Sequence, residues 1–339
     1  MLAAKLTEKE TVELDRVETP QPEAGEVLLA IKLCGICGTD LHRWHGKWEG
    51  GAFGHEFCAV AEEVGPRVSG LQEGDRVAGE CFGYCGRCEA CQEGNYNHCA
   101  EINWNPGRPA GAMAEKMTYP VASLVRVPKS LNDREVALIE PLAVACRVVS
   151  RGGLGPGDTV AIVGAGTIGL LCVAVADEMG AGRIFSIARH AHQADLAVRM
   201  GASEVCTPDD GDPREFIGKA TDGQGVDLSI DSVASGTSFS TALAFPHPRG
   251  RVVEAGGVTR PLLAALGPLV NGELTVTGSS CYATTDSKRD IERAAELLAD
   301  GGLTVEELVT HTYPLSEAQK AFQTADDKET GSVKVMLEC

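Results

Sequence analysis

Four cysteines lie within one short, polar stretch of the chain. Cys85, Cys88, Cys91 and Cys99 are separated by two, two and seven residues. Four thiolates at this spacing suit a closed tetrahedral zinc site that staples a loop. The stretch is too polar for four unrelated core thiols, and an iron–sulfur cluster is the weaker alternative. Cys81, just upstream, is a competing ligand whose spacing breaks the pattern.

A glycine-rich turn follows the apolar run Val160 to Val163 and precedes an apolar helical stretch. The turn has the pattern Gly-x-Gly-x-x-Gly and consists of Gly164, Ala165, Gly166, Thr167, Ile168 and Gly169. Glycines let the backbone turn tightly and approach a pyrophosphate, whose charge then lies at the positive end of the helix dipole. Because a strand precedes the turn and a helix follows it, the sequence predicts a dinucleotide site.

The end of the next expected strand indicates which dinucleotide is bound. About twenty residues past such a turn, an Asp or Glu ordinarily binds the adenosine ribose and selects NAD. Here the strand Ile184 to Ile187 is followed by Ala188, Arg189 and His190. No carboxylate repels a 2′-phosphate, and Arg189 is a cation suited to it, unless it and His190 are simply solvated. The sequence predicts NADP(H) as the preferred cofactor, with NAD(H) as the alternative.

A third set of reactive residues is dispersed along the chain. Cys37, Thr39, Asp40 and His42 lie in one segment, followed at a distance by His55 with Glu56, and later by Glu140. A thiolate, an imidazole and carboxylates are a plausible zinc-binding set. Their separation in sequence is too large for spacing alone to assign a site.

The elements that must position these residues change in character along the chain. Up to about residue 145, short apolar runs such as Glu26 to Leu33 and Phe57 to Gly65 are broken by Gly, Pro and Asp, which favours a β-rich fold. From about Arg147 onward, apolar strands alternate with amphipathic stretches. This alternation predicts the βαβ units of a doubly wound parallel sheet.

The expected parallel sheet has strands and helices at defined places. Strands are expected at 159–163, 184–188, 228–232, 251–255 and 274–278, and helices at 168–179, 191–200 and 286–300. A chain of 339 residues is expected to form two domains.

Charge and composition exclude several classes of protein. The chain has 30 Lys and Arg against 48 Asp and Glu, a formal net charge of −18, so its surface repels nucleic acid and anionic lipid. No secretory signal and no membrane-spanning apolar run is found. Thirteen cysteines in such a long chain indicate thiols and metal sites rather than disulfides. We therefore expect a cytoplasmic protein without nucleic-acid or membrane partners.

Taken together, these motifs resemble those of zinc-dependent medium-chain dehydrogenases. The matching segments are CGICGTDLH, GHE, the four-cysteine lobe, the Glu-Pro pair at 140–141 and VGAGTIG, in that order over nearly the whole chain. The resemblance implies a GroES-like, β-rich catalytic domain at 1–147 and 281–339. It also implies a Rossmann cofactor domain at 148–280, with the active site in the cleft between the two.

The resemblance also implies roles for individual residues. Cys37 and His55 match catalytic zinc ligands, and Glu56 matches the adjacent acid that ligates directly or supports the ligands. Glu140 stands where the best-known alcohol dehydrogenases have a cysteine ligand, as in the polyol and threonine dehydrogenase branch. Thr39 matches the family's hydroxyl that begins the proton relay, and His42 matches the outer end of that relay. Asp40 matches the carboxylate that orients the zinc-binding histidine. The four cysteines match the structural zinc lobe, which gives two zinc ions per chain.

The implied reaction is reversible oxidation of a secondary alcohol to a ketone, on a polyol, sugar or related substrate. A threonine-like amino alcohol is a second possibility. A cofactor-binding protein without turnover and a DNA-binding zinc finger are alternatives from other classes.

The resemblance also indicates residues near the substrate. Four aromatic residues match segments that border the family's substrate cleft: Trp44, Trp48, Trp104 and Tyr282. Cys281 stands where sorbitol-type enzymes have an arginine. Cys34 and Cys37 also form a CxxC pair, although zinc ligation by Cys37 is favoured. We expect a homotetramer, with a dimer second.

Overall fold

The computed structural model describes residues 1–46, 53–258 and 261–339. Its internal contacts divide the chain into two units. Unit 1 comprises Met1–Glu140, Asp286–Gly301 and Glu306–Cys339, and unit 2 comprises Pro141–Thr285 and Gly302–Val305. These junctions differ by several residues from the boundaries expected from the sequence, because helix α4 (Ile139–Arg151) belongs to unit 2 from Pro141 onward.

Unit 1 is built mainly of β-strands with a few short helices. Its strands are β1 (Leu2–Glu8), β2 (Thr11–Arg16), β3 (Glu26–Gly35), β4 (Glu56–Val64), β5 (Arg76–Gly79), β6 (Phe82–Gly83), β7 (Asn103–Trp104), β8 (Lys116–Pro120), β9 (Leu124–Arg126), β17 (Lys288–Arg289), β18 (Val309–Pro314) and β19 (Lys334–Glu338). Its α-helices are α1 (Gly38–Trp44), α2 (Glu89–Gln92), α3 (Asp133–Ala137), α10 (Asp290–Ala299) and α11 (Ala318–Asp326).

The main sheet of unit 1 has the strand order β18-β19-β3-β4-β5-β9, with β8 also pairing with β3. Strand β3 lies in the middle of this sheet, so polar and apolar residues do not alternate regularly along it. Most of its side chains, including Val27, Leu29 and Ile31, are buried. The core that these strands share also includes the rings of Phe57 and Phe322. The sheet brings the last strand of the chain beside β3, which leads directly into the segment that carries Cys37.

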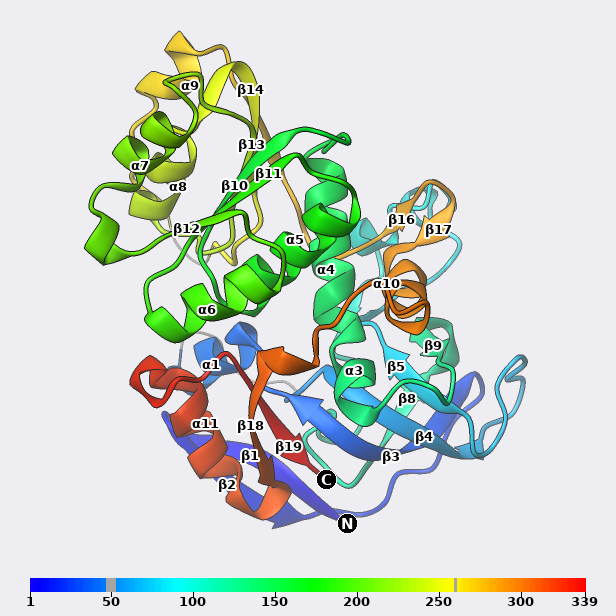
Figure 1. Ribbon diagram of the computed structural model, residues 1–339. Helices are drawn as coiled ribbons and strands as arrows, with labels where there is room; N and C mark the ends of the chain where they lie inside the picture. The colour runs from blue at the N-terminus through cyan, green and yellow to red at the C-terminus, as the bar shows by residue number, and fades with distance from the viewer. Residues whose placement is uncertain (47–52, 259–260) are drawn as a thin grey trace. The chain divides into compact units, whose positions relative to one another are not determined.

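Unit 2 contains one six-stranded parallel sheet of strand order β12-β11-β10-β13-β14-β15. These strands are β10 (Thr159–Val163), β11 (Arg183–Ile187), β12 (Glu204–Cys206), β13 (Val226–Asp231), β14 (Pro246–Glu254) and β15 (Thr275–Gly278); the two-residue strand β16 (Thr284–Thr285) follows. Figure 1 shows helices α5 (Thr167–Glu178) and α6 (Ala191–Arg199) on one side of this sheet, with α7 (Pro213–Ala220) and α8 (Gly236–Ala242) on the other. Helix α9 (Gly267–Asn271) precedes the edge strand β15.

The order of strands in unit 2 reverses between β10 and β13, which is the crevice where open parallel sheets bind ligands. Strand β10 is buried on both faces, as its apolar run Val160 to Val163 predicts, and β13 is buried along most of its length although polar residues alternate with apolar ones in it. The predicted Rossmann sheet is thus confirmed.

Three details of the predicted elements are wrong. The strand expected at 251–255 begins earlier, at Pro246. The helix expected from Asp286 begins at Asp290, because Asp286 and Ser287 adopt positive φ angles of 50° and 64° and form a turn before β17. The edge strand β12 was not expected, since three residues are too short for a clear pattern. No helix in the described part of the chain is both long and apolar enough to cross a membrane.

Candidate functional site

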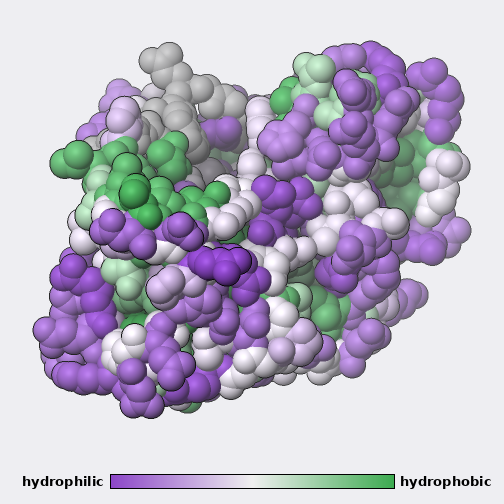
Figure 2. Space-filling view, turned by 90° about the horizontal axis from the view of Figure 1, so that it is seen from above, coloured by the Kyte–Doolittle hydropathy of each residue, from purple (hydrophilic) through white to green (hydrophobic). Residues whose placement is uncertain are grey.

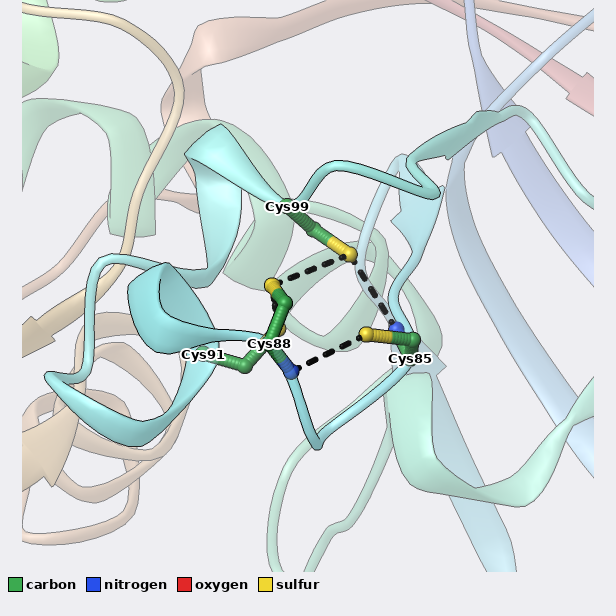
Figure 3. A group of neighbouring side chains, drawn as sticks. All are labelled: Cys85, Cys88, Cys91 and Cys99. Atoms are coloured by element: carbon green, nitrogen blue, oxygen red, sulfur yellow. Dashed lines mark hydrogen bonds between the residues drawn. The ribbon is translucent and has the colours of Figure 1, made fainter.

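The four cysteines of the polar stretch converge in unit 1. One sulfur atom from each of Cys85, Cys88, Cys91 and Cys99 lies within 4.8 Å of the others, and Figure 3 shows the four side chains directed toward a common centre. Cys81 is not in this group. The segment is held by backbone N–H donors: Cys88 donates to the sulfur of Cys85 at 3.4 Å, and Cys85 donates to that of Cys99 at 3.3 Å. This arrangement fits a tetrahedral zinc ion.

The ionisation of these thiols also fits a cation. Backbone N–H groups lower the pKa of Cys88 to about 6, whereas burial and the neighbouring sulfurs raise the pKa of Cys91 to about 12. Thiolates this close repel one another unless a cation lies between them. A zinc ion at the centre would keep all four deprotonated.

Buried polar and aromatic side chains tie the four-cysteine lobe to the rest of unit 1. The Tyr96 hydroxyl donates to Oε1 of Glu80 at 2.6 Å, and a guanidinium nitrogen of Arg289 lies 3.6 Å from Oε2. Burial raises the pKa of Glu80 to about 7 despite Arg289. The ring of Trp104 packs edge-on against that of Phe82, with the ring centroids 5.4 Å apart, and Trp104 is 51% exposed. The lobe is therefore anchored independently of its cysteines.

A second set of metal-binding groups forms where α1 and β4 begin. The Cys37 sulfur, a ring nitrogen of His55 and a carboxylate oxygen of Glu56 all lie within 4.8 Å of one another. Cys37 immediately precedes α1, and His55 immediately precedes the strand that starts at Glu56. Sequence spacing did not establish this convergence, but the fold brings the three residues together. A thiolate, an imidazole and a carboxylate are a suitable donor set for zinc.

Asp40 holds the two segments of this set in position. It is fully buried on α1, and its carboxylate accepts from the backbone N–H of Cys37 at 3.0 Å and of Gly54 at 3.2 Å. Since Gly54 precedes His55, one carboxylate fixes both ligand-bearing turns. Gly54 itself has φ +76°, and a Cβ there would collide with Cys34, so only glycine fits this turn.

The environment of His55 is strongly negative. Burial lowers its pKa, but the adjacent Cys37, together with Glu140 and Asp40, raises the pKa well above the ordinary value. A metal cation would satisfy the same field in place of the proton. Glu140 is buried in the first turn of α4 and acts on His55 through its charge, but it is not among the three donors within 4.8 Å of one another.

Glu56 has a partner that the sequence did not reveal. The Nζ of Lys334, on the last strand β19, lies 2.5 Å from Oε2 of Glu56 and 3.2 Å from the carbonyl oxygen of Ile36. Both charged side chains are buried. The only sequence signal is a lysine within the apolar run Val333 to Leu337. A metal ion bound by Glu56 would have to share this carboxylate with the ammonium group of Lys334.

The residues predicted for the proton relay lie on one helix. Thr39 and His42 are three residues apart on α1, so their side chains share a face, and both are half-buried. Helix α1 starts directly after Cys37, which places the hydroxyl of Thr39 next to the turn that carries the thiol.

The residues predicted to contact substrate are less well supported by their surroundings. Trp44 is buried in the core of unit 1, where its ring packs 6.1 Å from that of Phe322. Tyr282 is fully buried. For both, packing is the better explanation. Trp48 lies outside the described residues.

In unit 2, the glycine turn requires glycine for steric reasons at two of its three positions, Gly164 and Gly169. Gly164 has φ +97°, and a Cβ there would lie 2.5 Å from Val233. A Cβ on Gly169 would overlap the carbonyl oxygen of Gly164, so the helix can pack only with glycine. Gly166 precedes α5 and faces open space, which leaves room for a phosphate at the helix N-terminus.

The end of β11 lies next to this turn. The backbone N–H of Gly164 donates to the carbonyl of Ile187 at 3.0 Å, and that of Ala188 donates to Cys206 at 2.9 Å. Ala188 is buried, Arg189 is exposed, and His190 is half-buried at the start of α6. The structure therefore brings the cofactor residues predicted from the sequence to one edge of the sheet.

Comparisons with known proteins agree with this arrangement. Residues 23–129 match the family described as alcohol dehydrogenase GroES-like domain, and residues 167–300 match the zinc-binding dehydrogenase family. The sorbitol dehydrogenase of Bacillus subtilis is 31% identical over 99% of this chain and 97% of its own length. The D-xylulose reductase A of Aspergillus oryzae is 32% identical over 88% of this chain and 86% of its own length.

Solved structures show the same fold. The alcohol dehydrogenase TADH from Thermus sp. ATN1 superposes with a TM-score of 0.89 at 30% identity, covering 100% of this chain and 99% of that one. A Sinorhizobium meliloti 1021 protein described as a zinc-binding dehydrogenase and bound to NADP gives a TM-score of 0.90 at 30% identity, covering 100% and 99%.

The fold and site define a zinc-binding, nicotinamide-dependent dehydrogenase that acts on a small-molecule alcohol. The chain belongs to the zinc-dependent medium-chain alcohol dehydrogenase family, as its motifs predict. The predicted GroES-like and Rossmann architecture is confirmed with it.

Proposed function

We propose that the protein oxidises a secondary alcohol of a polyol or sugar to a ketone, reversibly, with NADP(H) preferred over NAD(H). The observation that carries the proposal is the convergence of Cys37, His55 and Glu56 within 4.8 Å beside the helix that bears Thr39 and His42. The names of the relatives, a sorbitol dehydrogenase and a D-xylulose reductase, support the substrate class.

Two zinc ions per chain are proposed, one held by the four cysteines and one by the second set of donors. The second zinc ion is bound by Cys37 and His55, and either Glu56 or Glu140 is its third protein ligand. A zinc ion held there would supply the Lewis acidity that lets an alcohol lose its proton near neutral pH, and a bound nicotinamide would supply the hydride acceptor. The buried Asp40 accepts hydrogen bonds from both ligand-bearing turns and so fixes their positions relative to each other.

The chain's own residues carry the proton. The Oγ1 of Thr39 accepts it from the substrate hydroxyl and donates its own proton onward, and the imidazole of His42, on the same face of α1, delivers it to solvent.

A direct test measures turnover and metal together. Polyols, aldoses, ketoses and amino alcohols are screened with both cofactors, and zinc is measured in wild type, Cys37→Ser and Cys91→Ser. We expect reduction of NADP with polyols, about two zinc ions per chain in wild type, and about one in each variant. If only threonine-like amino alcohols were oxidised, the proposed polyol or sugar substrate would be wrong and an amino alcohol would take its place. Full zinc in Cys37→Ser would refute the ligand assignment.

We further propose that the protein is a homotetramer, with a dimer as the second possibility. Within the described residues, the edge strand β15 pairs with β14 alone. Apolar side chains are exposed on it and on the segment before it: Leu263 (94%), Leu266 (52%), Val270 (72%) and Val276 (38%). Figure 2 shows hydrophobic side chains gathered in a patch on the face seen from above. An exposed edge with apolar residues suits pairing with a second chain. Light scattering giving a monomer mass at micromolar concentration would contradict this.

A further inference from the structure

Two acidic side chains lie side by side at the carboxyl ends of neighbouring strands in unit 2. Asp231 is the last residue of β13 and Glu254 is the last residue of β14, and the parallel register pairs them directly. Asp231 is fully buried. On its other side Asp231 pairs with Val163, the residue that leads into the glycine turn. The acid pair therefore lies at the edge where open parallel sheets bind their ligands.

The two carboxyl groups have unequal sets of hydrogen-bond donors. Asp231 accepts from the backbone N–H of Val233 at 2.9 Å and from the hydroxyl of Ser238 at 2.8 Å. Glu254 accepts at Oε1 from the backbone N–H of Gly256 at 3.0 Å. Among the residues that the structure describes, no donor reaches the buried Oε2 of Glu254. Because such bonds stabilise a carboxylate, Asp231 is the better place for a negative charge.

The contact between the two acids requires a proton. The side chains of Glu254 and Asp231 are hydrogen-bonded to each other, and two carboxylates can only accept. Burial raises the pKa of both groups, and burial together with the charge of Asp231 raises the pKa of Glu254 to about 8. Near neutral pH the pair therefore holds one proton, on Oε2 of Glu254, and one negative charge, on Asp231.

The elements around the pair carry few other charges. Helix α8, strands β10 and β15 and the described loop residues 232–235 and 255–258 contain no charged side chain. The nearest titratable residue after β15 is Cys281, and Arg260 lies outside the described residues. The remaining charged or titratable groups of β13 and β14 lie toward the amino ends of these strands: Asp227, His247, Arg249 and Arg251. The field at Glu254 is therefore set mainly by Asp231.

Asp231 is bonded to the loop that packs on the glycine turn. The N–H that it accepts belongs to Val233, and a methyl group of Val233 lies 2.5 Å from where a Cβ on Gly164 would be. In the same loop the hydroxyl of Ser232 donates to the carbonyl oxygen of Val163 at 2.9 Å. The position of Asp231 thus determines how this loop lies against the turn.

Glu254 is bonded to the next loop, which supports the first one. It accepts from the N–H of Gly256, and a Cβ on Gly256 would collide with Ala234 in the loop after β13. Ala234 has φ +60°, in the left-handed region that alanine rarely adopts. A backbone conformation of this kind persists only where its surroundings hold it in place. The two acids and their bonds to Val233 and Gly256 are part of those surroundings.

We propose that Asp231 and Glu254, sharing one proton, are positioning residues for the dinucleotide: they hold the loops after β13 and β14 against the glycine turn, and binding weakens when the proton leaves. The inference rests on the proposed function only in placing a nicotinamide dinucleotide at the glycine turn, and it holds for NADP(H) and NAD(H) alike. Loss of the proton to solvent breaks the bond between the two acids and leaves two adjacent negative charges. Like charges repel, so the loops bonded to them shift.

Cofactor binding measured against pH tests the inference without turnover. NADH and NADPH are titrated into the zinc-loaded protein and followed by their fluorescence. A group with a pKa of about 8 loses most of its proton between about pH 7 and pH 9, so the affinity for both cofactors should fall about tenfold over this range. The 2′-phosphate of NADPH, with a second pKa of about 6, remains a dianion over most of this range. Circular dichroism at each pH verifies that the protein stays folded.

A conservative variant assigns the effect to the pair. In Glu254→Gln the amide donates a hydrogen bond to Asp231 at every pH, so binding should match wild type at pH 7 and lose most of the fall at pH 9. The infrared band of protonated carboxyl groups should weaken more between these pH values in wild type than in Glu254→Gln. The matched control is Glu273→Gln, which removes an exposed carboxylate before β15 and should behave as wild type.

The outcomes separate this inference from the proposed function. A fall that is absent from wild type, or equally large in Glu254→Gln, overturns the inference and leaves the proposed function intact. Weakened binding by Glu254→Gln at pH 7 also overturns it, because the amide supplies the same hydrogen bond. Failure of wild type to bind either cofactor at pH 7 overturns the proposed cofactor site and this inference with it.

Discussion

Replacing Lys334 by methionine removes the cation that faces Glu56 inside unit 1. The Lys334 and Glu56 side chains are 3% and 2% exposed, and Nζ lies 2.5 Å from the carboxylate. Methionine preserves much of the aliphatic stem, so the main change is the loss of one charge and its hydrogen bonds. In protein from which zinc has been removed, Glu56 then remains as a buried carboxylate without its ion-pair partner.

The expected loss follows from that burial. Removing one partner of a buried ion pair costs about 3–5 kcal/mol, because the remaining charge is left desolvated. Glu56 has little room to adapt, since its carboxylate lies where a Cβ on Gly35 would be. At about 2–4 °C per kcal/mol, the melting temperature of Lys334→Met should fall by at least about 6 °C.

Urea unfolding followed by tryptophan fluorescence measures this loss. Trp44 and Trp104 lie in the described part of unit 1, so their fluorescence reports the unit that contains the ion pair. The control is the double variant Glu56→Gln/Lys334→Met, which removes both charges and should recover much of the lost stability. A loss below about 1 kcal/mol, or a double variant as unstable as the single one, would refute the reasoning.

Three further changes have defined outcomes. Gly169→Ala should abolish binding of NADPH, measured by its fluorescence, because the methyl group displaces the glycine turn, whereas Gly218→Ala, which faces open space on α7, should bind normally. Cys91→Ser should lose about one zinc ion per chain and melt at a lower temperature; unchanged melting would argue against a structural metal. Burial and Asp231 raise the pKa of Glu254 to about 8, so the folded state binds more protons than the unfolded one from about pH 4.5 to 8, and stability falls as pH rises through this window. Urea titrations should show a shallower fall in Glu254→Gln.

The sequence alone determined the features that depend on short spacing. The four cysteines, the glycine turn and the Ala188 to His190 segment each lie within fifteen residues, so local backbone geometry nearly dictates how they are arranged. The central strand β10 could be predicted because burial on both faces favours a continuous apolar run, Val160 to Val163. The metal-ligand and relay roles of Cys37, His55 and His42 came from family resemblance and stay predictions.

Only the tertiary structure decided what lies beside these residues. Lys334 reaches Glu56 across 278 residues of chain because the sheet places β19 against β3. The convergence of Cys37 with His55, the bridging role of Asp40 and the deep burial of Trp44 have the same origin. The physical reason is that local propensity depends on a few neighbouring residues, whereas contacts between distant segments depend on strand order, which no short pattern in the chain encodes.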